Sequence, residues 1–200
     1  VFAASRVINK KTATNTADNK TQQQTQQTQA VPKDELELQN IGLQSFEDIN
    51  YTDQALREYS SKGLKGFYYF GDSLSGGRTN PNFEFSSIKD DAKIVAAVDG
   101  EIVFMNEQTE TKDFEVFLQT SETSRWIIGY DHLVDVLVKK GDKVKAGDVL
   151  GRAAVQNNGL RRFEFQVNKK QAGADDLHIC PTTLLAGSVK DAVTNSLKTM

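Results

Sequence analysis

Three short segments of this chain carry polar side chains at alternating positions, and these side chains are of types that could perform chemistry. Segment by segment, they are Asn80, Asn82 and Glu84, then Tyr130 and His132, and then Arg162, Glu164 and Gln166. Residues two apart in an extended strand project from the same face, so each group would share one face of a sheet. If one sheet joins the segments, their carboxylates, imidazole and guanidinium converge, and the row either lines a site or forms a solvated face.

Residues 93–167 carry the strand patterns that must position these side chains. Three pieces are rich in β-branched and aromatic residues: AKIVAAVDGEIVFM, WIIGYDHLVDVLVKKGDKVKAGDVLG and RRFEFQV. A glycine stands beside an acidic residue between such runs at 98–101 and again at 140–142. That chemistry is typical of a tight hairpin turn, so the stretch predicts a compact antiparallel β unit.

The segments on either side of this unit predict short elements. Residues 66–71 form an aromatic run between glycines, which predicts a buried strand, and residues 72–81 have the composition of a loop. Upstream, Pro32 and the capped sequence at 52–59 predict two short helices in an extension over residues 32–65. Downstream of Pro181, the apolar residues stand at helical spacing, which predicts a final helix or tail over residues 187–200.

The composition fits one domain preceded by a polar leader. The chain has 24 basic and 27 acidic residues and a formal net charge of −3, so nothing indicates a polyanionic partner such as nucleic acid. No apolar run approaches the roughly 20 residues that span a bilayer, so no transmembrane segment is expected. Cys180 is the single cysteine and cannot form an internal disulfide.

Residues 1–31 are predicted to form a disordered leader rich in Gln and Thr. Residues 9–31 are almost entirely Asn, Lys, Thr, Ala and Gln, and such a segment has no apolar area to offset the entropy lost on ordering. A flexible spacer of this kind suits a domain held away from a surface, and a plain disordered tail has the same composition. Val1 and Ala3 have the small-residue spacing of a signal-peptidase site, and an arbitrary start of the sequence explains them equally well.

Four motifs follow one another in order between about Gly71 and Leu185. They are AAVDGEIV at 96–103, YDHL at 130–133, VKKGDKVKAGDVLG at 138–151 and CPTTLL at 180–185. In this order they resemble the lysostaphin-like (LytM-type) zinc metalloendopeptidases, a family that cuts peptidoglycan cross-bridges. The resemblance implies a mainly β domain over residues 66–186, with the antiparallel sheets of the duplicated hybrid motif, a disordered leader and a few short helices.

The chain departs from this family at the residues that would hold zinc. The family uses a His-x-x-x-Asp pair and the second histidine of a His-x-His motif as ligands, and two other histidines assist catalysis. By the resemblance, Asn80, Glu84 and Glu164 stand at the three ligand positions, as vestigial metal positions. Arg162 replaces one assisting histidine and His132 retains the other, as vestigial catalytic positions. A different alignment of the strand ends would put Arg162 at the ligand position, and the zinc-binding histidine is missing either way.

No metal and no other cofactor is expected at these positions. Zinc sites rely mainly on imidazole nitrogen and thiolate sulfur, whereas one Asn and two Glu supply only oxygen. Ca²⁺ or Mg²⁺ suits oxygen ligands better, although each usually needs more of them. The fixed positive charge of Arg162 would instead pair with Glu84 and Glu164 in a metal-free arrangement.

The other reactive side chains favour structural roles. His132 stands next to Asp131 and is predicted to be a hydrogen-bonded structural residue, because without a metal-bound water it has no nucleophile to activate. Cys180 lacks the histidine partner of a thiol enzyme, and Trp126 is expected in the core. A biotin or lipoyl carrier needs a lysine in its hairpin, and a phosphocarrier of the glucose-permease type needs two facing histidines. The chain lacks these residues at the corresponding positions, which argues against both classes of protein.

These observations predict a non-catalytic, peptidase-like module that binds, scaffolds or activates at the cell envelope. By the resemblance, its partner would be an envelope protein or peptidoglycan and its location extracytoplasmic, because degenerate relatives activate cell-wall amidases or join envelope-spanning assemblies. The alternative is a metal-dependent peptidoglycan endopeptidase with unusual ligands.

Overall fold

The computed structural model describes residues 35–49, 57–58, 60–61, 63, 65–157 and 159–200. All of them belong to one unit, residues 34–200. The predicted leader over residues 1–31 lies outside the described residues, and the predicted domain boundaries stay predictions. None of the described helices has the length and apolar character of a membrane span.

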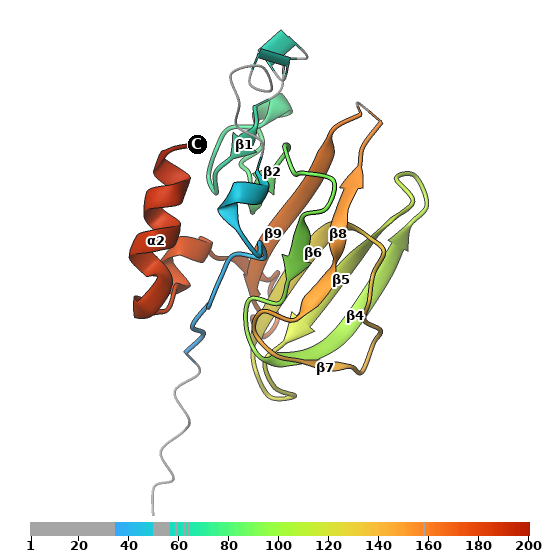
Figure 1. The fold of residues 1–200 in the computed structure, drawn as a ribbon. Helices are drawn as coiled ribbons and strands as arrows, with labels where there is room; N and C mark the ends of the chain where they lie inside the picture. Colours follow the sequence, from blue (N-terminus) through green and yellow to red (C-terminus); the bar gives the residue numbers. More distant parts are fainter. Residues whose placement is uncertain (1–34, 50–56, 59, 62, 64, 158) are drawn as a thin grey trace, which may run out of the picture. The chain divides into compact units, whose positions relative to one another are not determined.

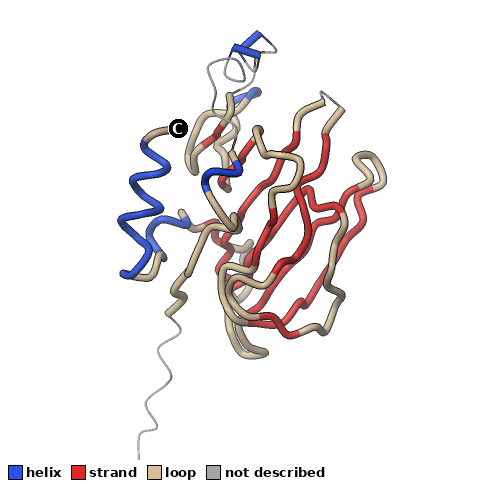
Figure 2. Tube along the Cα trace, viewed as in Figure 1, coloured by secondary structure: helices blue, strands red, loops and turns tan. Residues whose placement is uncertain are grey.

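Antiparallel strands are the main regular secondary structure of the described chain (Figures 1 and 2). They are β1 (Phe67–Tyr68), β2 (Phe83–Phe85), β3 (Lys93–Val95), β4 (Gly100–Gln108), β5 (Asp113–Gln119), β6 (Trp126–Val134), β7 (Lys143–Val144), β8 (Val149–Val155), β9 (Arg161–Lys169) and β10 (Leu177–His178). Hydrogen-bonded neighbours follow the order β1-β2-β9-β8-β6-β5-β4-β7, with further pairing of β9 to β6, β10 to β9 and β3 to β8. The predicted mainly β, antiparallel fold class is confirmed.

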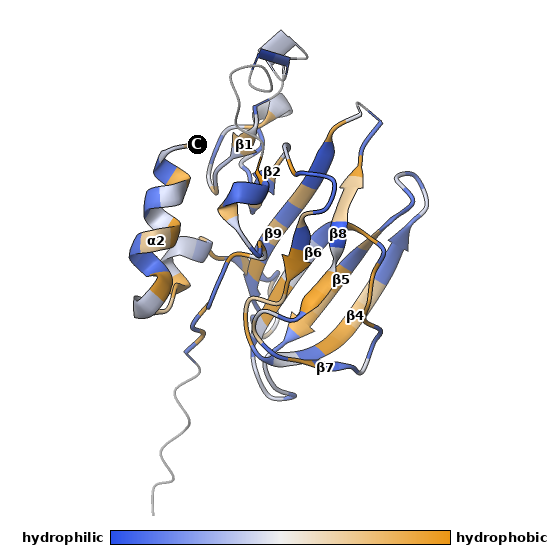
Figure 3. Cartoon of the chain, in the orientation of Figure 1, coloured by the Kyte–Doolittle hydropathy of each residue, from blue (hydrophilic) through white to orange (hydrophobic). Residues whose placement is uncertain are grey.

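Alternating apolar residues on the strands build the core. Along β9, Phe163, Phe165 and Val167 are fully buried while the residues between them are half-buried, and the hydrophobic and hydrophilic bands alternate along this strand in Figure 3. Phe83 and Phe85 of β2 are buried against them, and the Phe85 and Phe163 rings stack 6.0 Å apart. Burying each such ring stabilises the fold by about 2–3 kcal/mol. The strands that carry the polar residues are therefore held in place by the packing of their opposite, apolar face.

Two identical turns form the glycine-rich segment between β6 and β8. In each, an aspartate side chain accepts a hydrogen bond from the backbone N–H of a lysine three residues earlier, Asp142 from Lys139 and Asp148 from Lys145. The intervening Gly141 and Gly147 both have φ of 90°, which glycine adopts without steric cost. The predicted turn at 140–142 is present, but it links β6 to β7, which do not pair with each other, so it is not a hairpin.

The predicted hairpin at residues 98–101 is also wrong, because β3 pairs with β8 whereas β4 pairs with β5 and β7. Gly100 is needed there for close packing. A Cβ at Gly100 would lie 2.5 Å from the backbone oxygen of Gln119 on β5. The glycine is therefore needed because two strands approach closely at this point. In the sequence, such a glycine looks the same as the glycine of a hairpin turn.

The longest described stretch of the predicted helical extension, residues 35–49, consists mainly of bends and isolated β-bridges. It contains one short 3-10 helix, η1 (Phe46–Asp48), and its apolar side chains Leu36, Leu38, Ile41 and Leu43 are buried in the core. Leu38 donates its backbone N–H to Leu184 and accepts from Ala186. The predicted helix after Pro32 is therefore wrong over these residues, since burial in the core overrides local propensity. Most of the helix predicted at 52–59 lies outside the described residues.

Short helical elements complete the fold. They are η2 (Ser75–Gly77), η3 (Pro181–Leu184) and the α-helix α2 (Gly187–Lys198). The sequence prediction of a helix at the C-terminus is confirmed, and Val193 and Leu197 are its buried residues.

Candidate functional site

The pairing of β2, β9 and β6 brings the acidic residues of the polar rows into one line. Glu84 on β2 lies opposite Glu164 on β9, and Glu164 lies opposite Asp131 on β6. Residues directly opposite in an antiparallel pair share a face and lie within side-chain contact. Three carboxylates in a row repel one another unless positive charge lies between them.

Arg162 supplies that charge. Its Nη2 lies 3.1 Å from Oε2 of Glu84 and forms a closer ion pair with Oε1 of Glu164, so one guanidinium joins both carboxylates. Asn82 donates its side-chain N–H to the other oxygen of Glu164. Burial acts to raise the pKa of Glu164, but His132, Arg162 and Asn82 together hold it below its ordinary value. Burial raises the pKa of Glu84, which Arg162 offsets only in part.

A β-bulge in β6 turns His132 toward this row. Phe114 and Val116 of β5 lie opposite Leu133 and Tyr130, so the single residue Glu115 faces both Asp131 and His132. His132 has φ of 62°, a left-handed conformation that is uncommon for a residue other than glycine. A bulge of this kind re-aims a side chain, and here it directs two consecutive residues toward Glu164.

The bulge overturns the predicted pairing of Tyr130 with His132 on one face. Tyr130 is fully buried in the core, where its hydroxyl accepts a hydrogen bond of 2.7 Å from the backbone N–H of Ala97. Strict alternation would have put His132 in the core as well. The extra residue in β6 breaks the alternation between the two positions.

His132 sits among three carboxylates. Its Nδ1 lies 2.8 Å from Oδ2 of Asp113, and its Nε2 lies 3.5 Å from Oε1 of Glu164 and 3.9 Å from Oδ2 of Asp131. Burial acts to lower the pKa of His132, but the hydrogen bonds and charges of these carboxylates outweigh it and raise the pKa to about 8. The imidazole is therefore mostly protonated at neutral pH and donates from both nitrogens.

Asn80 stands apart from this cluster. Its side-chain amide donates to the backbone oxygens of Tyr69 at 3.1 Å and Asn82 at 3.0 Å, and the side chain is almost fully buried. These bonds fasten the loop at residues 72–81 to the start of β2. The structure thus brings together four of the five residues picked from the sequence, namely Glu84, His132, Arg162 and Glu164.

Sequence reasoning missed Asp113 and Glu115. Both lie on β5, where they alternate with the core-facing residues Phe114 and Val116, so the same parity rule could have found them. Among the described residues, the ligand atoms of Asp113, Asp131 and His132 form one group close enough to hold a metal ion, within 4.8 Å of one another. The 2.8 Å separation of His132 and Asp113 is that of a hydrogen bond, and Thr111 and Gln156 also donate to Asp113.

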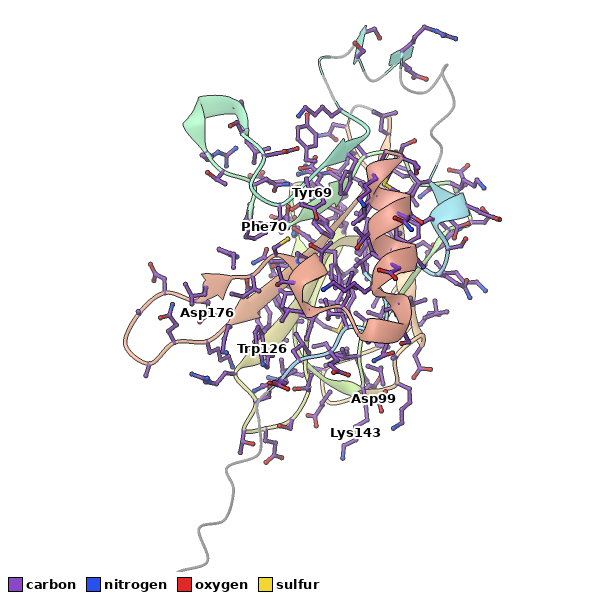
Figure 4. All side chains as sticks on the ribbon, turned by 90° about the vertical axis from the view of Figure 1, so that its left-hand side faces the viewer. Tyr69, Phe70, Asp99, Trp126, Lys143 and Asp176 are labelled. Carbon is purple, nitrogen blue, oxygen red and sulfur yellow. The ribbon has the colours of Figure 1, made fainter. Side chains whose placement is uncertain are left out.

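A cavity of about 650 Å³ lies elsewhere on the sheet. Its walls include Asp99 and Lys143, which are labelled in Figure 4, and Glu101 and Glu122. None of the residues around Glu164 lines it. The cavity therefore does not belong to the charged cluster.

Comparison with protein families places this cluster in a known type of domain. Residues 84–175 match Peptidase family M23, a range that includes Glu84, His132, Arg162 and Glu164 but not Asn80. A search of the curated proteins found no match.

Several solved structures are similar to this chain. The solution structure of lysostaphin is 19% identical with a TM-score of 0.50, over 59% of this chain and 49% of lysostaphin. A mutant catalytic domain of the prophage-encoded M23 protein EnpA from Enterococcus faecalis is 18% identical with a TM-score of 0.45, over 56% of this chain and 84% of that domain. A chain of the SpoIIQ–SpoIIIAH pore-forming complex is 17% identical with a TM-score of 0.47, over 78% of this chain and 98% of that one.

The chain thus spans about half the length of lysostaphin. The antiparallel sheet, the order of the motifs and the family match agree with one another. Residues 84–175 therefore match Peptidase family M23, and the chain has a lysostaphin-like fold.

Proposed function

We propose that this chain is a non-catalytic, peptidase-like module that binds or scaffolds other molecules at the cell envelope. The observation that carries this proposal is the position of Arg162, whose guanidinium joins Glu84 and Glu164. By the resemblance, those two residues stand where the family has zinc ligands. A guanidinium cannot be deprotonated in a protein, so it acts as a permanent cation at this place.

The residues present do not fit zinc. The side-chain N–H of Asn80 is committed to backbone oxygens, and both carboxylates are engaged by Arg162. A metal ion there would have to displace a bound cation and would gain only oxygen ligands, whereas zinc sites are built mainly from nitrogen and sulfur. His132 directs its nitrogens at carboxylates in place of a metal. We therefore assign no metal-dependent step to the cluster.

The cluster also offers no nucleophile of its own. Among the described residues around Glu164, the side chains are carboxylates, amides, one guanidinium and one imidazole that is mostly protonated at neutral pH. A protonated imidazole with its nitrogens hydrogen-bonded cannot act as a general base. Its role in the proposal is to neutralise the carboxylates that the bulge brings together.

The place of action and the partner follow from the family type. Because the domain resembles enzymes that act on peptidoglycan, the proposal puts this chain outside the cytoplasm, with an envelope protein or peptidoglycan as its partner. Lysostaphin from Staphylococcus simulans is described as an antimicrobial peptidase, and this chain is proposed to keep the fold without the hydrolysis. A metal-dependent peptidoglycan endopeptidase with unusual ligands is the competing function.

Peptidoglycan digestion tests the proposal. The purified chain is incubated with peptidoglycan at neutral pH, with and without added zinc, and newly released amino groups are measured. Lysostaphin, on peptidoglycan that it cleaves, is the positive control. We expect no release in either condition. Release that depends on zinc and is lost in Glu164→Gln would establish the competing function and contradict ours.

A further inference from the structure

The sheet face that carries Glu164 also carries an exposed aromatic surface. Cross-strand register puts Phe104 of β4 opposite Phe117 of β5, and Phe117 opposite Gly129 of β6. The two rings lie 5.8 Å apart, and Phe104 is 50% exposed. A Cβ at Gly129 would lie 3.2 Å from the Phe117 ring, so this ring packs over the glycine and a side chain there would press against it. We call Phe104, Phe117 and Gly129 the aromatic step.

Carboxylates stand directly beside the aromatic step. Glu115 is two residues from Phe117 on β5, and Asp131 is two residues from Gly129 on β6. Residues two apart on a strand share a face and are separated by about 6.6 Å. The aromatic step and these two carboxylates are therefore neighbours on one continuous surface.

This corner of the face has too little positive charge. Glu115 is half-buried and forms no ion pair with any residue in the described part of the chain. Burial raises its pKa, the charges of Asp131 and Glu164 raise it further, and the charge of His132 offsets these effects only in part. Burial raises the pKa of Asp131 as well, with His132 as an incomplete offset. A cation placed beside these two carboxylates would be stabilised.

We infer that the aromatic step and the carboxylates of Glu115 and Asp131 form a docking surface for a lysine or arginine side chain of a partner polypeptide. The apolar stem of that side chain covers the ring of Phe104, and ring faces attract cations. The charged head then reaches the two carboxylates, with which it forms charge-assisted hydrogen bonds. This inference rests on the proposed function, because it gives the binding module the chemistry of its partner.

Other occupants fit this surface less well. An apolar side chain would cover the rings but add no positive charge beside the two carboxylates. A neutral sugar could stack on Phe104 and would share that defect. An acidic ligand would be repelled by Glu115, Asp131 and their neighbour Glu164. Only a cation with an apolar stem uses both halves of the surface.

A peptide titration tests the inference on the full chain. The ¹⁵N-labelled protein is titrated at low salt with the blocked peptide acetyl-Gly-Gly-Lys-Gly-Gly-amide, and with the same peptide carrying Gln in place of Lys. We expect weak binding of the lysine peptide, with amide shifts at residues 104, 115, 117, 129 and 131 that shrink as salt is added. The glutamine peptide should leave these amides unshifted.

Matched variants separate the two halves of the surface. Phe104→Ser and Glu115→Gln should each weaken lysine-peptide binding about twofold to fivefold, the range expected for an exposed cation–π contact and an exposed ion pair. Leu137→Ser removes another exposed apolar side chain, 71% exposed and outside this surface, and should leave binding unchanged. Unaltered thermal unfolding of the variants shows that they are folded.

Two results would overturn the inference: equal binding of the lysine and glutamine peptides, or lysine binding that Glu115→Gln leaves intact. Either result would leave the non-catalytic assignment standing, because digestion is a separate readout. Zinc-dependent digestion together with lysine binding would instead contradict the proposed function and leave the docking surface in place.

Discussion

At the residue scale, the cluster around Glu164 is a set of carboxylates held together by one guanidinium and one imidazole. Arg162 joins two carboxylates, and His132 contacts carboxylates through both nitrogens. The alternation of polar residues correctly placed Glu84, Arg162 and Glu164, whereas for His132 it gave the wrong face. It could not identify the partnership of His132 with Asp113, because the bulge that allows it breaks the alternation on which the reasoning depends.

Removing the arginine should be costly. Arg162→Gln leaves Glu84 and Glu164 buried side by side without their shared cation, so we expect a loss of about 2 kcal/mol in the free energy of unfolding. This is less than the 3–5 kcal/mol of a fully buried pair because the arginine side chain is one third exposed. Urea unfolding at neutral pH measures it.

A matched control and a second variant sharpen that prediction. Arg78→Gln alters an exposed arginine in the loop at residues 72–81 and should change stability by less than about 0.5 kcal/mol. Glu84→Gln combined with Arg162→Gln should recover part of the loss, because it removes one of the two stranded charges. Equal stability of Arg162→Gln and the native chain would mean that the ion pairs are only a surface feature.

The pKa of His132 predicts a pH dependence of stability. Its folded-state value of about 8 lies above the ordinary value of 6.5, so the protonated imidazole stabilises the fold. This contribution, about 2 kcal/mol, is fully present below pH 6.5 and is lost as the pH rises through 8. Urea unfolding from pH 6 to 9.5 should show the loss in the native chain and a much smaller one in His132→Gln. Parallel curves for the two proteins would contradict the assignment.

At the element scale, strands and the final helix followed from the sequence, whereas strand partners did not. The apolar alternation of β9 and the helical spacing of α2 are local properties, and both elements form as predicted. The glycines at 98–101 and 140–142 signalled hairpins, yet the strands that flank them pair elsewhere. A glycine beside an acidic residue indicates only that the backbone turns locally. Which strands pair with each other depends on which apolar faces are buried together.

Gly100 gives an element-scale prediction. Gly100→Ala puts a Cβ 2.5 Å from the Gln119 backbone oxygen, so β4 and β5 must separate, and we expect a loss of about 1–3 kcal/mol. Gly187→Ala is the matched control, because a Cβ there meets nothing within 4 Å. Thermal unfolding compares the two. A Gly100→Ala chain as stable as the Gly187→Ala chain would show that the strands can adjust freely.

At the scale of the whole molecule, the apolar side chains of residues 35–49 complete the hydrophobic core that the sheet forms. Local propensity predicted an α-helix here, but four buried apolar side chains and backbone hydrogen bonds to residues 184 and 186 hold the segment against the core in another conformation. No local pattern reveals such a contact, because its partners lie about 150 residues away and the gain comes from burial. The family resemblance did predict the fold class and the location of the cluster, because the order of the motifs along the chain reflects the order of the strands in the fold.

The closing segment should therefore contribute strongly to stability. Leu38 is fully buried, so Leu38→Ala should cost about 2–5 kcal/mol in the free energy of unfolding. Glu37→Ala changes the exposed neighbouring residue and should cost little. Urea unfolding of both variants is the measurement. Equal, small losses would mean that residues 35–49 add little to the core.

The most direct test of the central claim is the zinc bound by the native chain after dialysis against excess zinc and removal of free metal, measured by elemental mass spectrometry. Because Arg162 already supplies the positive charge between Glu84 and Glu164, the account predicts no retained zinc. Stoichiometric zinc that disappears in Glu84→Gln or Glu164→Gln would contradict it.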